Sequence, residues 1–514
     1  MSLKSQPKGL YVLFFAEAWE RFSYYGMRAL LVLYLVNQLK MKRADALEIY
    51  AIYTGLVYFT PLIGGYLADK YLGARKAILI GGSVMALGHL AMAFEPLLNI
   101  ALGLLILGNG FFKPNISTIV GGLYEEHDPR RDGGFTIFYM GINLGAFFSP
   151  LVCGTLGEKV GWHYGFSAAS VGMILGLLVF YMGQKVIGPA GFPPAHGGEA
   201  RTELNGKDYF DVLIYVIGSV ISVVGFLEIW KFAGPVWKTY GFMTKGLIVI
   251  SIIACLEFFR RVMLPDSRED VEPLTSDEWQ RILVICVLAV FVIFFWMGFE
   301  QAGGTMTLFA DAQTDRHFMG YEIPASYFQA INPLAIMILA PFFSMFWLWL
   351  AESRYAISTP AKMAVGMIML GLGFIVMYFG QQIATGNDHY GWVPMIAGGV
   401  GANFNMNVFV FQNGTVGPIW LTMVYVIHTF GELCLSPIGL SMVTKLSPVR
   451  MVSLMMGVWF VSSALSNYLA GMLEELLGVY NVPVYGFLIL SSIGSGLVLL
   501  MLTPWLKKCM HGRD

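Results

Sequence analysis

The stretch LYVLFFAEAWERFSYYGMRALLVLYLV, residues 10–36, joins a long apolar run to four ionisable side chains near its middle. A helix of about 20 apolar residues is long enough to cross about 30 Å of hydrocarbon. A secretory leader would instead have an uncharged apolar core and a small-residue cleavage site, and neither is present here. We therefore expect this stretch to be a retained first transmembrane helix.

Thirteen further apolar stretches of similar length follow along the chain, so the sequence predicts fourteen membrane spans. They lie at residues 49–69, 77–94, 98–121, 135–157, 164–184, 210–230, 244–263, 281–302, 324–350, 361–381, 416–442, 452–475 and 485–506. Hydrophobic residues make up 56% of the chain and charged residues 13%, whereas soluble domains carry about 25% charge. The composition predicts an all-α integral membrane protein.

Net charge and cysteine usage exclude other classes of protein. The net charge of −1 provides no basic field for nucleic acid. The five cysteines are scattered, without CxxC spacing, so neither a zinc site nor a disulfide framework is indicated. We expect no metal, no cofactor and no nucleic-acid partner.

The order of the spans suggests two halves separated by an insertion. The polar segment 186–209 and the charged segment 265–273 flank two hydrophobic helices, at 210–230 and 244–263, that look inserted. Without them, six plus six spans remain, as in transporters with two pseudo-symmetric halves and a central site. The predicted domains are a six-helix bundle at 1–185, a linker with two extra helices at 186–275, and a six-helix bundle at 276–514.

The distribution of Lys and Arg predicts the orientation, because cytoplasmic loops are enriched in both residues. With the N-terminus inside, 21 of them fall in cytoplasmic segments and 8 on the opposite side. Both termini are therefore expected in the cytoplasm.

The charges of the first span need a functional or structural reason, since each costs about 2.5 to 3.5 kcal/mol at mid-bilayer on insertion scales. At 100° per residue they share one stripe with a tyrosine, because many of the steps between them are i,i+4. The stripe consists of Glu17, Glu20, Arg21, Tyr24 and Arg28. Local pairing that only fixes helix packing is one interpretation, and a polar cavity is the other.

Three other charges interrupt the spans, and their positions suggest an electrically polar cavity. Lys113 lies in the N-terminal half, like Arg21 and Arg28, whereas Glu300 and Glu432 lie in the C-terminal half. A cavity between the halves would have a positive and a negative wall, which suits a zwitterion with a carboxylate and an ammonium group. Four further polar or aromatic residues in spans are candidates for its lining: Tyr58, Asn143, Asn332 and Trp459.

Several motifs closely resemble those of the proton-dependent oligopeptide transporters, the POT branch of the major facilitator superfamily. The segment GGYLADKYLGARK at 64–76 resembles the superfamily loop in which a tight turn and basic residues lock helices two and three together. The POT resemblance rests on ExxER, as Glu17, Glu20 and Arg21, and on four longer motifs: GNGFFKPNIS at 108–117, FYMGINLGAFFSP at 138–150, FEQ at 299–301 and GELCLSPIGLSMVTKLSP at 431–448. The resemblance covers nearly the whole chain and implies the major facilitator fold.

The resemblance also implies a role for each candidate residue in a symporter that imports di- and tripeptides with protons. Arg21, Arg28 and Lys113 would hold the peptide carboxylate, with Tyr24, Tyr25 and Tyr58 nearby. Glu432, Asn143 and Asn332 would bind the amino end, and Trp459 would line a side-chain pocket. Glu17, Glu20 and Glu300 would couple to the proton, with Glu300 expected to pair with Arg28 in an outward-open or occluded state. The second-span position where some relatives have a histidine is Thr54 here, so a histidine-based proton step is not expected at that position.

Other classes remain as alternatives at this stage. A carrier of a small anion such as nitrate would use the three cations, although Glu432 would then have no amine to bind. An enzyme would need a nucleophile–base pair or metal ligands in a span, and no such motif occurs. A channel would need repeated rings or filter loops, which this chain lacks. The inserted pair suggests a prokaryotic member in a bacterial inner membrane, and we expect a monomer.

Overall fold

The computed structural model describes residues 6–192 and 274–513, except 126, 127, 129, 319, 354–356, 386–414, 449 and 450, together with the single positions 206, 210 and 213. The N-terminal part of these residues forms α1 (Lys8–Leu33), η1 (Tyr34–Gln38), α2 (Arg43–Phe59), α3 (Pro61–Leu67), η2 (Ala68–Leu72), α4 (Gly73–Ala91), η3 (Glu95–Leu97), α5 (Leu98–Gly122), α6 (Arg131–Thr155), η4 (Leu156–Val160) and α7 (Trp162–Ile187).

The C-terminal part begins at α10, whose first turn is closed by a capping box between Thr275 and Glu278. Its elements are α10 (Ser276–Phe299), η5 (Glu300–Gly303), α11 (Thr305–Gln313), β1 (His317–Phe318), β2 (Tyr321–Glu322), η6 (Ala325–Ala330), α12 (Ile331–Ala351), α13 (Thr359–Ala384), α15 (Pro418–Leu446), α16 (Val452–Gly478) and α17 (Val484–Cys509).

Twelve of the fourteen predicted spans correspond to long helices in the described ranges. The inserted pair, predicted at 210–230 and 244–263, lies outside the described residues apart from positions 210 and 213. Two predicted spans are less regular than expected. The second breaks between α2 and α3, where Pro61 begins a new helix, and the span at 281–302 changes at Glu300 from α10 into the short turn η5.

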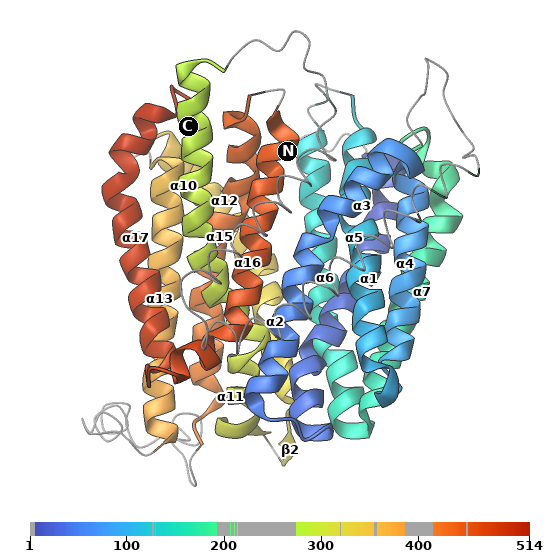
Figure 1. Ribbon diagram of the computed structural model, residues 1–514, viewed down its shortest axis with the longest axis vertical. Helices are drawn as coiled ribbons and strands as arrows, with labels where there is room; N and C mark the ends of the chain where they lie inside the picture. Colours follow the sequence, from blue (N-terminus) through green and yellow to red (C-terminus); the bar gives the residue numbers. More distant parts are fainter. Residues whose placement is uncertain are drawn as a thin grey trace, which may run out of the picture.

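The helices form two groups side by side in Figure 1, with α1 to α7 in blue to cyan and α10 to α17 in green to red. Across the junction, α2 packs against α16 and α6 packs against α12. Both chain ends lie at the same end of the bundle, and β1–β2 lies at the other (Figure 1). We call these the terminal end and the hairpin end. The predicted domain limits at 185 and 275 stay a prediction.

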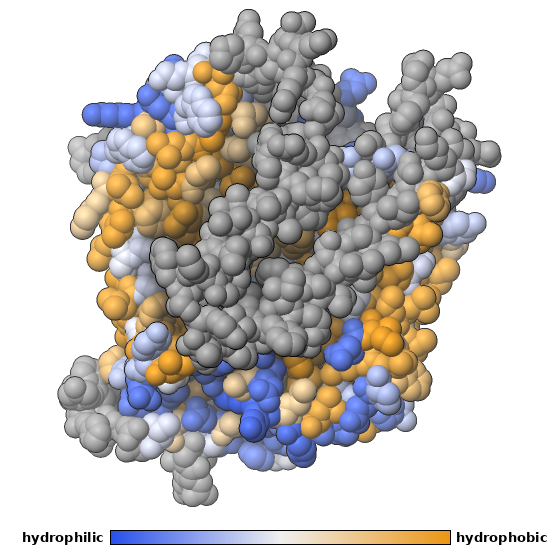
Figure 2. Space-filling model, viewed as in Figure 1, coloured by the Kyte–Doolittle hydropathy of each residue, from blue (hydrophilic) through white to orange (hydrophobic). Residues whose placement is uncertain are grey.

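The outer surface has the polarity of a membrane protein. Nine described helical segments are long and apolar enough to cross a membrane by length and composition. Large apolar side chains point outward, with exposed fractions of 77% for Met501 and 63% for Trp349. Figure 2 shows orange apolar side chains over the visible flanks, with a band of blue hydrophilic side chains at the hairpin end and further blue side chains at the terminal end. Outward apolar surface of this extent is expected where lipid replaces water.

At the terminal end, the segment predicted to lock helices two and three contains Arg75, which binds the end of α7. Gly73 has φ 72°, a left-handed conformation that glycine adopts without steric cost. The guanidinium of Arg75 then donates to the carbonyl oxygens of Ala190 at 2.7 Å, Gln184 at 3.3 Å and Gly188. A cation at a helix C-terminus satisfies carbonyls that the helix leaves free. This contact holds α4 to α7 within one half.

At the hairpin end, polar contacts join the two halves. Glu158 of η4 accepts from the backbone N–H of Ala325 at 2.7 Å and of Ser326 at 3.0 Å, at the start of η6. Further cross-half contacts are Asn37–Asp311 at 2.8 Å, Lys159–Glu322 at 2.8 Å, Arg316–Glu158 at 3.8 Å and Thr155–Tyr327 at 2.6 Å. We call this set of residues the hairpin-end latch. The strands β1 and β2 that carry part of it are a small addition to the predicted all-α fold.

Candidate functional site

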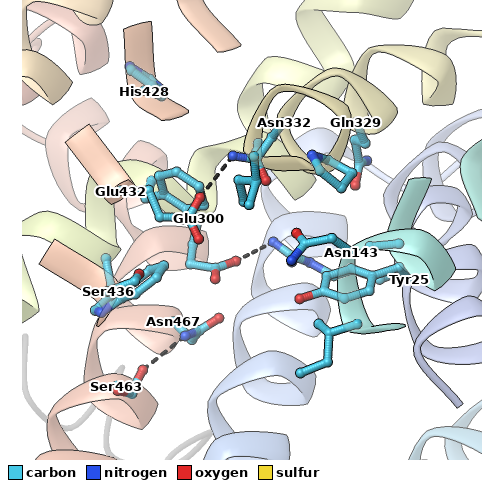
Figure 3. A pocket seen from close by; sticks show the side chains of 18 of the residues that line it. Tyr25, Asn143, Glu300, Gln329, Asn332, His428, Glu432, Ser436, Ser463 and Asn467 are labelled. Carbon is cyan, nitrogen blue, oxygen red and sulfur yellow. Dashed lines mark hydrogen bonds and ion pairs between the residues drawn. The ribbon is translucent and has the colours of Figure 1, made fainter. Parts of the chain in front are cut away.

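A cavity of about 350 Å³ lies between the two halves. Helices of both halves supply its lining, as Figure 3 shows for eighteen of the residues. Nine of the thirteen predicted site residues line it: Tyr25, Arg28, Tyr58, Lys113, Asn143, Glu300, Asn332, Glu432 and Trp459. The structure thus brings together side chains from helices far apart in the sequence.

The centre of the cavity is crossed by an ion pair between the halves. Arg28 of α1 donates to the Glu300 carboxylate, which confirms the predicted pair. The Arg28 Nε also donates to the hydroxyl of Tyr50 at 2.8 Å. Both charged side chains are at most 8% exposed, so each needs the other, because an isolated buried charge is strongly destabilising.

A glycine allows this pair to form. A Cβ atom at Gly303 would lie 1.9 Å from the Tyr50 hydroxyl and 3.0 Å from the Arg28 Nε. Only a residue without a side chain lets η5 approach the first two helices this closely. The turn at Glu300 and the glycine after it therefore act together to place the carboxylate against the opposite half.

Glu432 is held on the C-terminal wall by hydrogen bonds. Asn332 of α12 donates to the Glu432 carboxylate at 2.8 Å and to the Thr429 hydroxyl at 3.0 Å. Glu432 is 8% exposed, and we find no cation within ion-pair distance of it among the described residues. An amide donor satisfies part of the carboxylate and leaves its negative charge available to a ligand cation.

The N-terminal wall carries the positive charge. Lys113 of α5 lies with its ammonium 3.9 Å from the centre of the Tyr58 ring, a cation–π contact. Asn143 of α6 donates to its own helix, at the Tyr139 carbonyl oxygen 3.0 Å away, and its Oδ1 remains available as an acceptor. The walls therefore have the opposite charges that the sequence analysis predicted.

The remaining four predicted residues lie behind the cavity wall rather than in its lining. Arg21 is within 2.9 Å of Glu17 and 2.5 Å of Glu20, and Asn109 donates to Glu20 at 3.4 Å. All these side chains are nearly inaccessible, and so is Tyr24. In this conformation the ExxER residues form a paired buried cluster, so a direct contact of Arg21 or Tyr24 with a ligand stays a prediction.

Several polar residues that line the cavity were not predicted from the sequence. They are Tyr139, Gln329, Tyr425, Ser436, Ser463 and Asn467. Two of them continue a pattern that begins at Trp459, since Trp459, Ser463 and Asn467 follow at i, i+4 and i+8 on α16. This helical spacing is the sequence signal from which Ser463 and Asn467 could have been predicted. Among the described residues, no group of three or more His, Cys, Asp or Glu is placed to hold a metal ion.

Comparison with sequence families and curated proteins gives consistent matches. The sequence profile of the POT family matches residues 75–487. The chain is 35% identical to the peptide transporter YePEPT of Yersinia enterocolitica, with 91% of this chain and 87% of that protein covered. It is 33% identical to a di-/tripeptide transporter of Lactococcus lactis subsp. cremoris, with 98% and 97% covered.

Solved structures show the same similarity in three dimensions. A variant of peptide transporter POT in complex with alafosfalin matches with a TM-score of 0.75 and 34% identity, covering 100% of this chain and 97% of that one. A POT family transporter in complex with 5-aminolevulinic acid matches with a TM-score of 0.75 and 30% identity, covering 98% of each chain.

Proposed function

The chain belongs to the POT family, and from this membership we propose that it is a proton-coupled symporter that imports di- and tripeptides by alternating access. Relatives that span nearly the same length are named as peptide transporters. The family is one of transporters rather than enzymes. The gradient of protons across the membrane supplies the driving force in this proposal, and no cofactor takes part.

One observation carries the proposal, namely the opposite charge of the two cavity walls. Lys113 and Arg28 lie on the N-terminal wall, and Glu432 with Asn332 lies on the C-terminal wall. A short peptide has a carboxylate at one end and an ammonium group at the other, so it can satisfy both walls at once. Alafosfalin and 5-aminolevulinic acid, found in relatives, are also small polar molecules with an amine.

Coupling to protons follows from the Arg28–Glu300 pair. A proton on Glu300 would remove its negative charge and release Arg28 to the peptide carboxylate. Because one guanidinium cannot fully serve both carboxylates in the same state, proton and peptide binding are linked. Glu17 and Glu20, next to Arg21, are the other carboxylates proposed for this relay.

The test is uptake of labelled dialanine into proteoliposomes with an imposed inward proton gradient. We expect accumulation that excess unlabelled tripeptide abolishes and excess nitrate leaves unchanged. Competition by nitrate in place of tripeptide would favour the anion carrier. If dialanine does not accumulate under the imposed proton gradient even without a competitor, transport of this class would be contradicted.

Glu432→Gln tests the polarity of the site. We expect this change to weaken binding of free dipeptides about 10- to 150-fold, the loss of one charge-assisted hydrogen bond of about 1.5 to 3 kcal/mol. Dipeptides with an acetylated amine serve as the matched control, because they have no ammonium group to lose. An equal loss for both ligands would place the amine site elsewhere.

The location of the protein is proposed on the same basis. Bacterial relatives and the multi-pass fold support a bacterial inner membrane. The excess of Lys and Arg on one side supports both termini in the cytoplasm, so that the hairpin end would face outward.

A further inference from the structure

Asn467 places a buried hydrogen-bond acceptor in the cavity without a donor. The residue lies on α16, two turns after Trp459, and lines the cavity. It is 2% exposed, and its Oδ1 has no hydrogen-bond partner among the described residues. A buried amide oxygen without a donor is costly, so a group that arrives during the transport cycle is the natural partner.

The orientation of the Asn467 amide is fixed by its own helix. The Nδ2 donates to the carbonyl oxygen of Ser463 at 2.9 Å. The opposite amide orientation would set two oxygen atoms against each other, because a carbonyl oxygen can only accept. The Oδ1 must therefore point away from the helix, and Figure 3 shows it directed into the cavity.

The element that carries Glu300 packs against this part of α16. Gln301, the next residue of η5, donates to the Ala470 carbonyl oxygen at 2.9 Å, one turn beyond Asn467. Figure 3 shows the Asn467 oxygen on the side of the Glu300 carboxylate, which is bound to Arg28 through its other oxygen. Both acceptors line the same cavity, and a proton on the carboxylate would turn one of them into a donor.

We propose that Asn467 accepts a hydrogen bond from Glu300 when that carboxyl group is protonated, and so positions it for the coupled step. The proton comes from the aqueous side of higher proton concentration and binds a Glu300 oxygen. The ion pair with Arg28 breaks, an O–H···O bond to Asn467 forms, and Arg28 becomes free for the peptide carboxylate. This inference rests on the proposed proton-coupled function.

Other charged and titratable groups face Glu300 from the neighbouring helices, and the test must separate Asn467 from them. They are Arg28, Tyr24 and Tyr25 on α1, Tyr50 and Tyr58 on α2, Lys113 on α5, and Glu432 on α15. Arg28, Lys113 and Glu432 would act on Glu300 through their charge, whereas the tyrosines carry neutral hydroxyls. Asn467 is neutral and would act only through a hydrogen bond. Polar and apolar substitutions at position 467 should therefore shift the pH midpoint of uptake in opposite directions.

The experiment compares the pH dependence of proton-driven uptake in Asn467→Leu and Asn467→Asp proteoliposomes. Leucine removes the acceptor that favours the protonated carboxyl, so the pH of half-maximal uptake should fall by about half to one unit. Aspartate keeps an acceptor and adds a like charge, so the midpoint should rise. Peptide counterflow, which moves no net protons, should persist in both variants.

Two controls make the outcome decisive. Ser466→Ala removes a buried hydroxyl at the neighbouring position, which bonds to Ser462 outside the cavity lining, and should leave the midpoint unchanged. A Glu300→Gln background cannot take up the coupling proton, so the pH dependence of counterflow is compared there instead, and Asn467→Leu should not shift it. Unchanged midpoints in both variants, or a shift that persists in Glu300→Gln, would overturn the inference. Loss of counterflow in both would also overturn it, because Asn467 would then contact the peptide or support the fold. Wild-type protein without peptide uptake or counterflow would overturn the proposed function itself.

Discussion

The two ends of the molecule hold their helices together in different ways. At the hairpin end, charged and polar side chains of the N-terminal half bond to η6, β2 and α11 of the C-terminal half. At the terminal end, two arginines bind within their own halves. Arg75 binds the end of α7, and Arg513 donates to the Lys445 carbonyl oxygen at 3.2 Å.

This difference indicates that the hairpin end must lose its cross-half contacts before the cavity can open on that side. Opening the hairpin end would break the hairpin-end latch. The Arg75 and Arg513 contacts at the terminal end each join residues of one half, so they would persist when the halves move apart. Alternating access between two halves requires contacts of the first kind at whichever end is closed. The conformation is therefore closed at the hairpin end, and the Arg28–Glu300 pair continues that closure into the cavity.

The largest expected effect comes from adding one methyl group at Gly154, which lies against Ser326 of the hairpin-end latch. A Cβ atom at residue 154 would lie 2.0 Å from the Ser326 Oγ and 3.1 Å from its Cβ. Gly154→Ala should therefore disfavour the closed hairpin end by about 1 to 3 kcal/mol, a factor of roughly 5 to 150. Distances between spin labels at positions 40 and 479, in a cysteine-free background, would report the opening.

A second substitution tests that this effect comes from the close approach. Ser326→Gly removes the atoms that the new methyl group would meet, so the double variant should return toward the wild-type distance distribution. Persistent opening in the double variant would mean that Gly154 acts within its own helix.

A smaller effect is expected from Glu158→Gln. The carboxylate accepts from two backbone N–H groups, and an amide can accept with only one of its two terminal atoms. The closed hairpin end should lose about 1 to 2 kcal/mol, roughly 5- to 30-fold, in the same distance measurement. Glu95→Gln, an exposed carboxylate of the same half, is the matched control and should have no effect. Equal shifts of the spin-label distances in Glu158→Gln and Glu95→Gln would mean that Glu158 acts only through its contribution to the net charge.

The smallest effect is expected from Lys159→Ala. Both partners of the Lys159–Glu322 pair are partly exposed, so the pair should contribute under about 1 kcal/mol to the closed state.

The hydrogen bond from Lys159 holds the pKa of Glu322 below its ordinary value, with help from the nearby Arg316. A lowered pKa means that the pair is fully formed above the ordinary pKa and is lost only as pH falls through the lower one. The difference between wild type and Lys159→Ala should therefore be the same at pH 7 and pH 5. A difference that vanishes by pH 5 would show that the pKa of Glu322 is raised rather than lowered.

Much of the fold could be predicted because its signals are local. Apolar runs of membrane-spanning length identified twelve helices that the structure describes, and the i,i+4 stripe of α1 identified its buried charges. Run length could not locate the break before Pro61, which lies inside an apolar stretch, or the turn at Glu300, where the predicted span at 281–302 continued through the turn. The strands β1 and β2 are two residues each, too short to show an alternating pattern.

The sequence alone determined that this chain crosses a membrane and that ionisable side chains interrupt its spans in both halves. Composition and helical periodicity carry this information, since each depends only on residues a few positions apart. The Arg28–Glu300 pair was implied by the resemblance to a family rather than by any local pattern. The tertiary structure alone decided which side chains share the cavity. It placed the ExxER cluster behind the wall, brought Asn467 to the side of Glu300, and joined Glu158 to η6. Such contacts span more than 150 positions in the case of Glu158, and they depend on how all the helices pack together rather than on any local pattern.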